Sequence, residues 1–340
     1  MPTFCRHNRL LHHCPICARE QHVELTPVIS PGSPRTGTGQ RDRPKRASDR
    51  AGGPRESRTG TAGGSRQPGA AARLQVRRLE RGADDGYRVE LAPGLRSSVE
   101  AERLADELAF AATRLGALSE RPPGLYAEVA GPGDVEERVW LAFLIAYLCP
   151  LDEEDPFAAV RAVRTPWRSP ELPDLHAVRT GPRSAHDSTG TLRTLEAYRA
   201  WAGRGGSQAA AFTGDPGWTP ERRFTRVFER LALPGLHRDV RFDLLVTLGC
   251  LGLFALTPGQ LIVGGTDEVT VGAKRVFGIG ERFVLEGRAA ALARACALPL
   301  AALDLGLYNW QRGQRASVGL GPGAATDEAA RARARAALEL

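Results

Sequence analysis

The chain has 340 residues, of which 42% are hydrophobic, so it can build a sizeable core without disulfide or metal staples. No run of about 18 apolar residues occurs, and no apolar segment follows the first basic residues, so we expect a soluble, cytoplasmic protein with no membrane partner. The net charge of +7 is mostly due to arginine and favours a polyanionic partner such as DNA, although the arginine enrichment of a high-GC genome would give the same charge.

Residues 1–24 contain a compact set of metal ligands. Cys5 and His7 form a C-x-H pair, and Cys14 and Cys17 form a C-x-x-C pair. Four such ligands suit tetrahedral Zn²⁺ in a closed, structural site, and so short a segment would be unfolded without the metal. The sequence therefore predicts a zinc knuckle, in which His12 or His13 could replace His7. The alternative is a redox-active or incidental cluster of thiols.

Residues 25–72 are rich in Pro, Gly, Ser, Thr and Arg and contain almost no large apolar side chain. Such a segment cannot bury enough surface to offset the entropy lost on ordering, so we expect a disordered basic linker. Its arginines could touch a phosphate backbone, or they could simply keep the linker soluble.

Residues 73–312 have the pattern of a mainly helical domain. Alternating apolar residues on either side of a turn predict a small β-hairpin over 74–91. Ser98 is a candidate cap for a helix over 99–118, and Asp134 for an apolar helix that ends before Pro150. The proline-rich stretch 165–190 reads as a long irregular connection.

Further helices are expected along the rest of this domain. The periodicity of apolar residues places them at 191–202, 208–212, 220–232, 239–254, 269–277, 283–297 and 300–310. Cys149, Cys250 and Cys296 lie singly within such patterns and read as reduced core residues. Residues 313–340 are rich in Gly, Ala and Arg, and we expect a flexible tail.

Two glycine turns separate pairs of these helices. One is the Leu-Pro-Gly turn over 233–238, and the other places Gly278 and Gly280 on either side of Ile279. A G-hydrophobic-G turn is typical of the helix-hairpin-helix, whose backbone N–H groups bind a DNA phosphate. Lys274 and Arg275 would lie close to that phosphate. Either turn could be the phosphate-binding one, and an ordinary glycine-capped corner between helices is the alternative.

Asp304 is a single acid in an otherwise apolar stretch downstream of the second turn. In helix-hairpin-helix DNA glycosylases, an aspartate at a similar place in the order faces a base flipped out of the duplex. Here Asp304 lies a few residues further from the turn than in that family. The alternative is that Asp304 caps a final helix through the backbone N–H of Leu307.

Several segments together resemble the actinobacterial clade 3 family of alpha-glutamyl/putrescinyl thymine pyrophosphorylases. They are the knuckle over 4–17, G-P-R-S-A-H-D over 181–187, R-G-G-S-Q-A-A-A-F over 204–212, the run that begins E-R-L-A-L-P-G-L at Glu229, and A-K-R-V-F-G-I-G over 273–280. The resemblance covers most of 4–310 except the linker. It implies a glycosylase-like helical fold and an enzyme that makes a hypermodified thymine in DNA.

In that reaction an amine such as glutamate or putrescine displaces diphosphate from a pyrophosphorylated 5-hydroxymethyluracil. The base would be flipped into a pocket, and cations would hold the diphosphate. Candidate cations are Lys274, Arg275, Arg183 and Arg204. Asp304 or His186 is the candidate base for the amine, with Lys274 also counted in the catalytic set. Tyr198 and Trp201 are candidate stacking faces, with helix packing as the alternative reading.

Two other functions remain compatible with the sequence. One is a base-excision glycosylase in which Asp304 stabilises the cationic sugar, and the other is a non-catalytic zinc-containing DNA-binding or adaptor protein. The chain contains no P-loop, dinucleotide fingerprint, G-x-S-x-G or H-E-x-x-H motif, which argues against nucleotide hydrolysis, hydride transfer and zinc protease chemistry.

Overall fold

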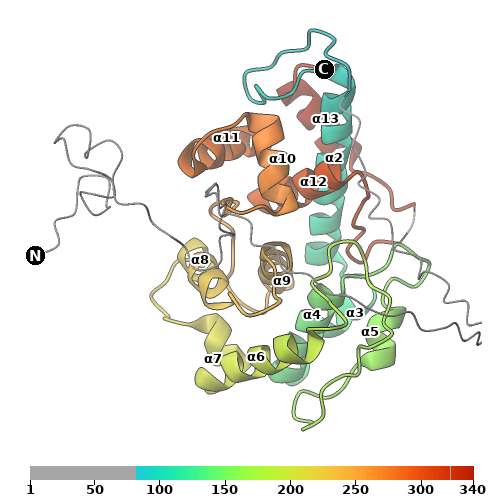
Figure 1. Ribbon diagram of the computed structural model, residues 1–340, viewed down its shortest axis with the longest axis vertical. Helices are drawn as coiled ribbons and strands as arrows, with labels where there is room; N and C mark the ends of the chain where they lie inside the picture. Colours follow the sequence, from blue (N-terminus) through green and yellow to red (C-terminus); the bar gives the residue numbers. More distant parts are fainter. Residues whose placement is uncertain (1–81, 322) are drawn as a thin grey trace, which may run out of the picture. The chain divides into compact units, whose positions relative to one another are not determined.

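The computed structural model describes residues 82–321 and 323–340, all of which belong to the compact unit Leu74–Leu340. The predicted zinc knuckle and linker lie outside the described residues. Twelve helices account for the described regular structure (Figure 1). They are α2 (Ser98–Glu120), α3 (Leu125–Ala130), α4 (Val135–Leu148), α5 (Ala158–Val163), α6 (Thr191–Arg204), α7 (Gln208–Thr213), α8 (Pro220–Arg230), α9 (Arg238–Cys250), α10 (Glu268–Phe277), α11 (Arg282–Ala295), α12 (Leu300–Arg312) and α13 (Glu328–Ala337).

The prediction of a mainly helical domain is confirmed, and each helix expected from periodicity forms within a few residues of its predicted bounds. The short helices α3 and α5, six residues each, were not expected, because one or two turns are too short to establish a period. Asp134 caps α4 as expected, its side chain accepting a hydrogen bond from the Glu136 N–H at 2.9 Å. None of the helices over 82–321 and 323–340 has by itself the length and apolarity of a membrane span.

The expected β-hairpin does not form in the part of it that the structure describes. No strand occurs over 82–321 or 323–340, and the hairpin's first arm lies outside these ranges. Asp84 and Asp85 accept hydrogen bonds from the N–H groups of Gly86 and Tyr87, each at 3.0 Å, and these local turns compete with pairing between strands. The Tyr87 hydroxyl donates to the Leu338 carbonyl, so this segment is fixed by the C-terminal residues instead.

Residues 313–340, expected to be a flexible tail, contain α13, which packs against α2. Ala330 and Ala334 are fully buried in this contact. Ion pairs join Arg331 to Asp106 at 2.7 Å and Arg335 to Glu102 at 2.8 Å. The alanines and arginines that predicted a flexible tail form an amphipathic helix, and its alanine face packs closely on α2.

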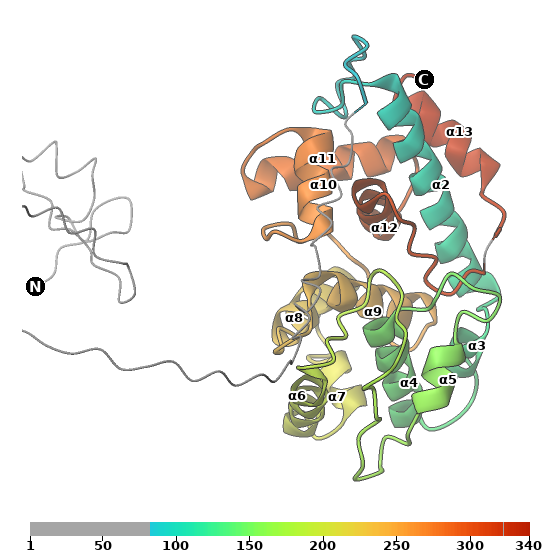
Figure 2. The ribbon, with the colours of Figure 1, turned by 45° about the vertical axis from the view of Figure 1, so that its right-hand side comes forward.

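The helices form two groups, which Figures 1 and 2 show from two sides. In one group α12 packs on α2 and α10, with α11 and α13 beside them; in the other α4 packs on α9 and α7, with α6 and α8 beside them. The two groups meet where α2 contacts α9. There Arg114 of α2 and Asp243 of α9 form a buried ion pair at 2.9 Å, and Arg114 also donates to Thr247 at 3.2 Å.

An aromatic cluster fills the space between α4 and α6. The rings of Phe143 and Tyr198 are stacked with centroids 3.7 Å apart, and Trp201 lies next to Tyr198 at 5.7 Å. Tyr198 is fully buried, and its hydroxyl donates to Gln208 at 2.7 Å. Tyr198 and Trp201 are therefore core residues, and the expectation that either stacks on a base was wrong; the packing interpretation holds.

Candidate functional site

The turn between α8 and α9 is a tight hairpin held against α6. Thr219 caps α8, and Pro220 occupies its first turn, where no N–H is needed. Gly235 has φ +74°, and a Cβ on it would lie 2.3 Å from the Thr194 hydroxyl oxygen, so only glycine fits there. Leu236, which follows, is buried between the helices. The turn is therefore fixed in place on the neighbouring helix.

The turn between α10 and α11 is built differently. Gly278 has φ +82° and ends α10, but a Cβ on Gly280 would meet Val284 only at an ordinary contact distance of 3.6 Å. Ile279 between them is 95% exposed. The sequence did not decide which of the two turns binds phosphate. The turn over 233–238 buries its apolar residue Leu236, whereas the turn over 278–280 exposes Ile279 to solvent.

A pocket of about 390 Å³ lies beside the α8–α9 turn. The starts of α9 and α10 both reach it, so two helix N-termini with their free N–H groups converge on one cavity. The residues that line it are Arg183, Ser184, His237, Arg238, Asp239, Val240, Thr266, Asp267, Glu268 and Tyr308. Asp267 caps α10 by accepting a hydrogen bond from the Thr270 N–H at 2.9 Å, which fixes its carboxylate at the pocket wall.

Asp304 lies behind this pocket as the centre of a buried ion network. It is 1% exposed and ion-pairs through one carboxylate oxygen with Arg183 and through the other with Arg238. Arg238 also contacts Asp239 at 3.1 Å and lies 4.0 Å from Asp267. Burial alone would lower the pKa of Arg183, but the adjacent carboxylates, Asp304 foremost, raise it above its usual value. Both arginines therefore remain charged.

Asp304 is not a helix cap. Pro299 occupies the N-cap position of α12, and Asp304 lies inside the helix on its buried side, so the capping interpretation was wrong. Asp304 is also absent from the pocket lining, whereas the two arginines that it holds are part of that lining. Its position is that of a residue that orients Arg183 and Arg238.

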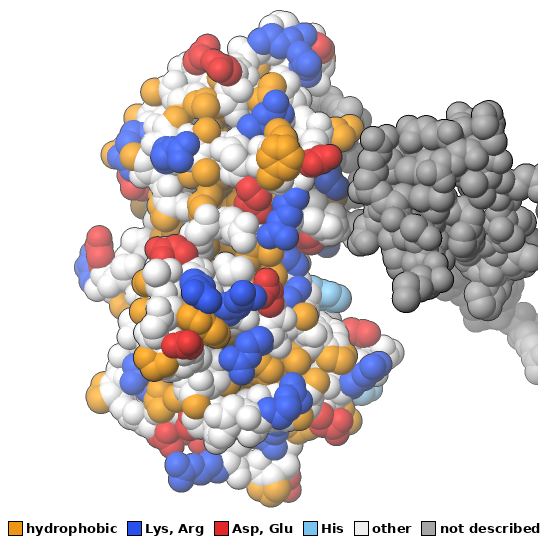
Figure 3. All heavy atoms as spheres, turned by 90° about the vertical axis from the view of Figure 1, so that its left-hand side faces the viewer, with side chains coloured by type: hydrophobic (Ala, Val, Ile, Leu, Met, Phe, Trp, Pro, Cys, Tyr) orange, Lys and Arg blue, Asp and Glu red, His pale blue; other side chains and the backbone are white. Residues whose placement is uncertain are grey.

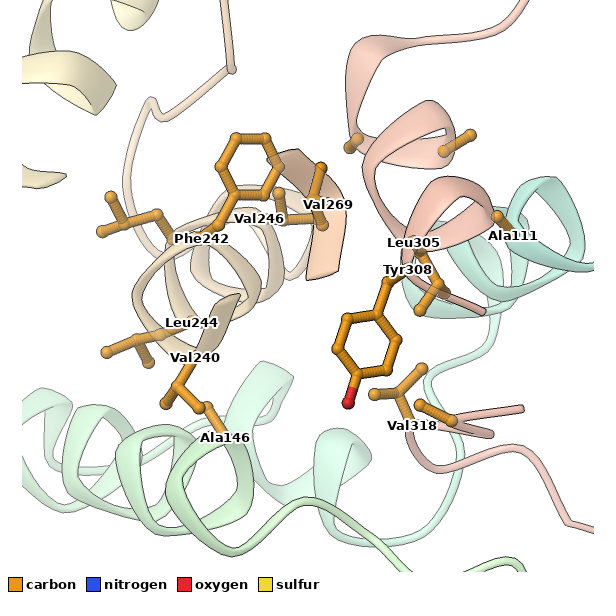
Figure 4. Packing of buried hydrophobic residues seen from close by; sticks show 14 of the residues in the cluster. Ala111, Ala146, Val240, Phe242, Leu244, Val246, Val269, Leu305, Tyr308 and Val318 are labelled. Atoms are coloured by element: carbon orange, nitrogen blue, oxygen red, sulfur yellow. The ribbon is translucent and has the colours of Figure 1, made fainter. Parts of the chain in front are cut away.

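The segment over 181–187 brings Arg183 to this place. Gly181 donates to the Cys149 carbonyl at 2.8 Å, and a Cβ on Gly181 would lie 2.4 Å from the Pro150 carbonyl oxygen, so glycine allows the loop to fold back onto the end of α4. The Tyr308 hydroxyl donates to the Pro182 carbonyl at 2.6 Å, and Figure 4 shows Tyr308 reaching out from α12. The loop is thereby fixed between both groups of helices.

The pocket wall carries acidic and basic side chains together. Burial raises the pKa of Asp239 above its usual value; Asp304 and Asp267 add to this rise, and the two arginines oppose it. The network holds three aspartates against two arginines, while Glu268 at the rim is paired with Arg312 at 3.0 Å. A carboxylate with a raised pKa, held in a pocket, is a candidate for proton transfer.

The other residues expected at the site lie elsewhere. His186 is not in the lining; its Nδ1 bonds the Thr191 hydroxyl at 2.9 Å. Arg275 pairs with Glu100 at 3.0 Å and stacks over Trp310, so it braces α10 against α2 and α12. Lys274 is exposed near the end of α10. Arg204 is exposed at the end of α6 and likewise absent from the lining.

The expected zinc ligands Cys5, His7, Cys14 and Cys17 lie outside the described residues. Over 82–321 and 323–340, no group of three or more His, Cys, Asp or Glu side chains is arranged to hold a metal ion. Cys149 and Cys296 are buried and free, as expected, and Cys250 is free and half-buried.

The sequence reasoning missed Asp239 and Asp267 as pocket residues. Asp239 directly follows the L-P-G-L-H-R run, and Asp267 directly precedes an apolar helix after Gly264 and Gly265. This pattern could have identified them, because a polar residue in the first turn of a helix after a glycine turn lies next to any ligand bound at the helix N-terminus.

No family model matches the chain, and no curated protein or solved structure matches it.

Proposed function

We propose that the described unit is a helix-hairpin-helix, glycosylase-like domain that modifies a base in DNA within the pocket beside the α8–α9 turn. The reaction proposed is the one implied by the sequence resemblance: an amine replaces diphosphate on a pyrophosphorylated 5-hydroxymethyluracil. Asp239 replaces Asp304 and His186 in this proposal as the candidate base. Arg183 stays a candidate cation, and Arg238 replaces Lys274, Arg275 and Arg204.

The observation that carries the proposal is the position of Asp239. Its carboxylate lies on the pocket wall, 3.1 Å from Arg238, at the start of α9 and directly after the hairpin turn. Burial raises its pKa, which makes the carboxylate a better proton acceptor than an exposed aspartate. A flipped base that enters beside the hairpin would meet this group and two fixed arginines together.

The chemistry assigns a separate task to each charge. The amine nitrogen forms a bond to the methylene carbon at position 5 of the base, and the carbon–oxygen bond to the diphosphate breaks. The diphosphate leaves with that electron pair and is stabilised by Arg183 and Arg238. The attacking nitrogen becomes positively charged and passes its extra proton to Asp239. Asp304 keeps both arginines in place throughout.

A second candidate function is base excision on the same scaffold. Asp267 supports it, because its carboxylate is fixed at the pocket wall by the cap of α10 and could stabilise a cationic sugar as the base leaves. The two reactions give different products from the same substrate: an amine-bearing thymine in one, an abasic site and a free base in the other.

The test is mass spectrometry of nucleosides from 5-hydroxymethyluracil DNA, pyrophosphorylated and plain, after incubation with the full chain and either glutamate or putrescine. We expect a new amine-bearing thymine from the pyrophosphorylated DNA. Its formation should rise with pH through the raised pKa of Asp239, because only the ionised carboxylate accepts a proton. In Asp239→Asn the rate should fall by about 10²–10⁴-fold.

The control is Asp155→Asn, which removes an exposed carboxylate that pairs with Arg161 and is not part of the pocket lining. Its rate should equal that of the wild type. If the wild type produces abasic sites and Asp267→Asn does not, base excision is the reaction and group transfer is rejected. Unchanged bases under every condition, with DNA still bound, would reject both reactions and leave a non-catalytic DNA-binding protein.

For residues 1–24 we propose a structural Zn²⁺ site formed by Cys5, His7, Cys14 and Cys17. The support is the spacing and chemistry of the four ligands, which suit a closed tetrahedral site with no open position for catalysis. In this proposal the zinc unit and the basic segment over 25–72 add DNA affinity, and the helical unit supplies the chemistry.

A further inference from the structure

The α10–α11 turn exposes two large apolar side chains that the proposed chemistry does not use. Ile279 is 95% exposed at the tip of the turn, and Phe283 is 71% exposed in the first turn of α11. Large apolar side chains left in water are unfavourable, and two of them four positions apart at one turn need a physical reason.

The charged side chains around this apolar tip are mixed, with exposed Lys274, Arg96 and Arg282 outnumbering the exposed Glu281. Ile279 borders a hollow of about 450 Å³ whose lining includes Arg96 and Lys274, both exposed. Arg282 lies beside Phe283 and is half-exposed, at 3.9 Å from Glu286. The acidic Glu100 in the hollow is already paired with Arg275. Figure 3, which views the side that carries α8 and α11, shows hydrophobic side chains interspersed with Lys and Arg and with some Asp and Glu.

The turn's backbone holds the tip rigidly. The Gly94 N–H donates to the Val276 carbonyl at 2.9 Å, and a Cβ on Gly94 would lie 2.1 Å from the Arg275 carbonyl oxygen, so the segment before α2 lies directly against the end of α10. Arg288 donates to the Phe277 carbonyl and ties α11 to α10. A projecting apolar tip on a fixed turn can enter another molecule without a large loss of conformational entropy.

We propose that Ile279 and Phe283 form an apolar wedge that contacts an unstacked base of a nucleic-acid strand, while Lys274 and Arg96 bind its phosphates. Apolar residues flanked by cations match a ligand that has flat apolar faces and a polyanionic backbone. The preceding residues of this same chain are an unsuitable occupant, because Lys and Arg outnumber Asp and Glu over 41–81 and would be repelled by Lys274 and Arg96.

The wedge and the pocket lie at opposite ends of one helix. α10 has ten residues and is about 15 Å long, with Asp267 at its start and Gly278 at its end. One strand could therefore have a base in the pocket and a neighbouring stretch on the wedge. The inference relies on the proposed function only for the choice of nucleic acid as the ligand, since the wedge takes no part in the chemistry.

The test uses the full chain and a single-stranded thymidine oligonucleotide that carries one 2-aminopurine, whose fluorescence reports unstacking, and a terminal dye for anisotropy. Phe283→Ser should weaken binding by about fivefold or more and reduce the 2-aminopurine change, because a stacking partner is lost. Ile279→Ser should act in the same direction. Lys274→Ala and Arg96→Ala should each lower the slope of log affinity against log salt by about 0.7.

Leu192→Ser is the matched control, since Leu192 is 60% exposed on α6 and its removal should leave binding and fluorescence unchanged. Equal weakening by Leu192→Ser and Phe283→Ser would overturn the wedge, and so would salt slopes that stay constant in both cation variants. A wild type that self-associates in sedimentation velocity while Phe283→Ser does not would assign the tip to a second copy of this chain and would also overturn it.

The outcome is separable from that of the proposed function. Ile279 and Phe283 lie outside the pocket lining, so the effect of Phe283→Ser on oligonucleotide binding is measured without any base chemistry. If Phe283→Ser weakens oligonucleotide binding but the wild type carries out no base chemistry, the proposed function is rejected and the wedge is supported. If the wild type carries out the base chemistry but Phe283→Ser binds the oligonucleotide normally, the wedge is rejected and the proposed function is supported.

Discussion

Asp304 is a charged residue that the fold buries completely, and its environment explains how the fold tolerates it. A buried carboxylate costs several kcal/mol of desolvation, which ion pairs with two arginines offset here. The same ion pairs compensate for the burial of Arg183 and Arg238, each less than a tenth exposed. The three residues come from α12, the loop before α6 and the start of α9, so the network fixes elements that are distant in sequence.

Replacement of Asp304 by Asn should therefore affect stability before it affects any chemistry. The amide keeps the shape but removes the negative charge, which leaves two buried guanidinium groups without their common partner. We expect a loss of about 3–5 kcal/mol in the free energy of unfolding, measured by urea denaturation. Asp155→Asn, which breaks an exposed pair with Arg161, should change it by less than about 1 kcal/mol. Equal small effects would show that the network contributes little.

The two glycine turns differ at the level of the helices that they connect. The α8–α9 turn packs Leu236 inside and lies against α6, whereas the α10–α11 turn leaves Ile279 in solvent. The first turn thus helps to shape the pocket, and the second provides a projecting surface. Both patterns look alike in sequence because each contains glycine next to an apolar residue between two amphipathic helices.

Alanine substitutions should separate the two turns. In Gly235→Ala the new Cβ would collide with the Thr194 hydroxyl at a residue with φ +74°, so we expect a loss of about 1–3 kcal/mol. In Gly280→Ala the Cβ meets Val284 at 3.6 Å without backbone strain, and stability should stay within about 0.5 kcal/mol of the wild type. Thermal denaturation of both variants provides the comparison, and an equal loss in both would contradict this account.

At the scale of the molecule, the unit Leu74–Leu340 builds its core from both groups of helices. α2 carries much of this connection, because it packs on α12 and α13 and also reaches α9. The buried apolar side chains form one cluster, whose first member in the sequence is Val89 and whose last is Leu338. The C-terminal helix is therefore part of the core. The segment over 1–24 has its own proposed source of stability, the zinc ion.

Metal analysis of the whole chain tests whether residues 1–24 depend on zinc for stability while the helical unit does not. The purified protein should contain about one zinc ion per chain, and Cys14→Ser should lose it, since three ligands rarely hold a structural zinc. Helix content by circular dichroism and the melting of the helical unit should remain at wild-type values in Cys14→Ser, because the core residues belong to the other unit. A wild-type zinc content in Cys14→Ser would rule Cys14 out as a ligand.

Much of the helical architecture follows from local patterns in the sequence. The apolar run of α4 and the cap at Asp134 depend only on neighbouring residues, and both were predicted correctly. The predicted hairpin over 74–91 failed in its described part, because aspartate side chains bond the backbone locally and Tyr87 finds a partner near the C-terminus. The tail prediction failed because the small face of α13 gains stability only by packing on α2.

The candidate site shows the same division. From the sequence alone, Asp304 is recognised as an acid in an apolar stretch, and the turn over 233–238 as a glycine turn between two helices. The folded structure was needed to show that Asp304 lies behind the pocket, that Asp239 and Asp267 line it, and that Ile279 is exposed to solvent. The physical reason is that helix periodicity and capping are local, whereas burial, ion pairing and the pKa of a carboxylate depend on neighbours that are far away in the chain.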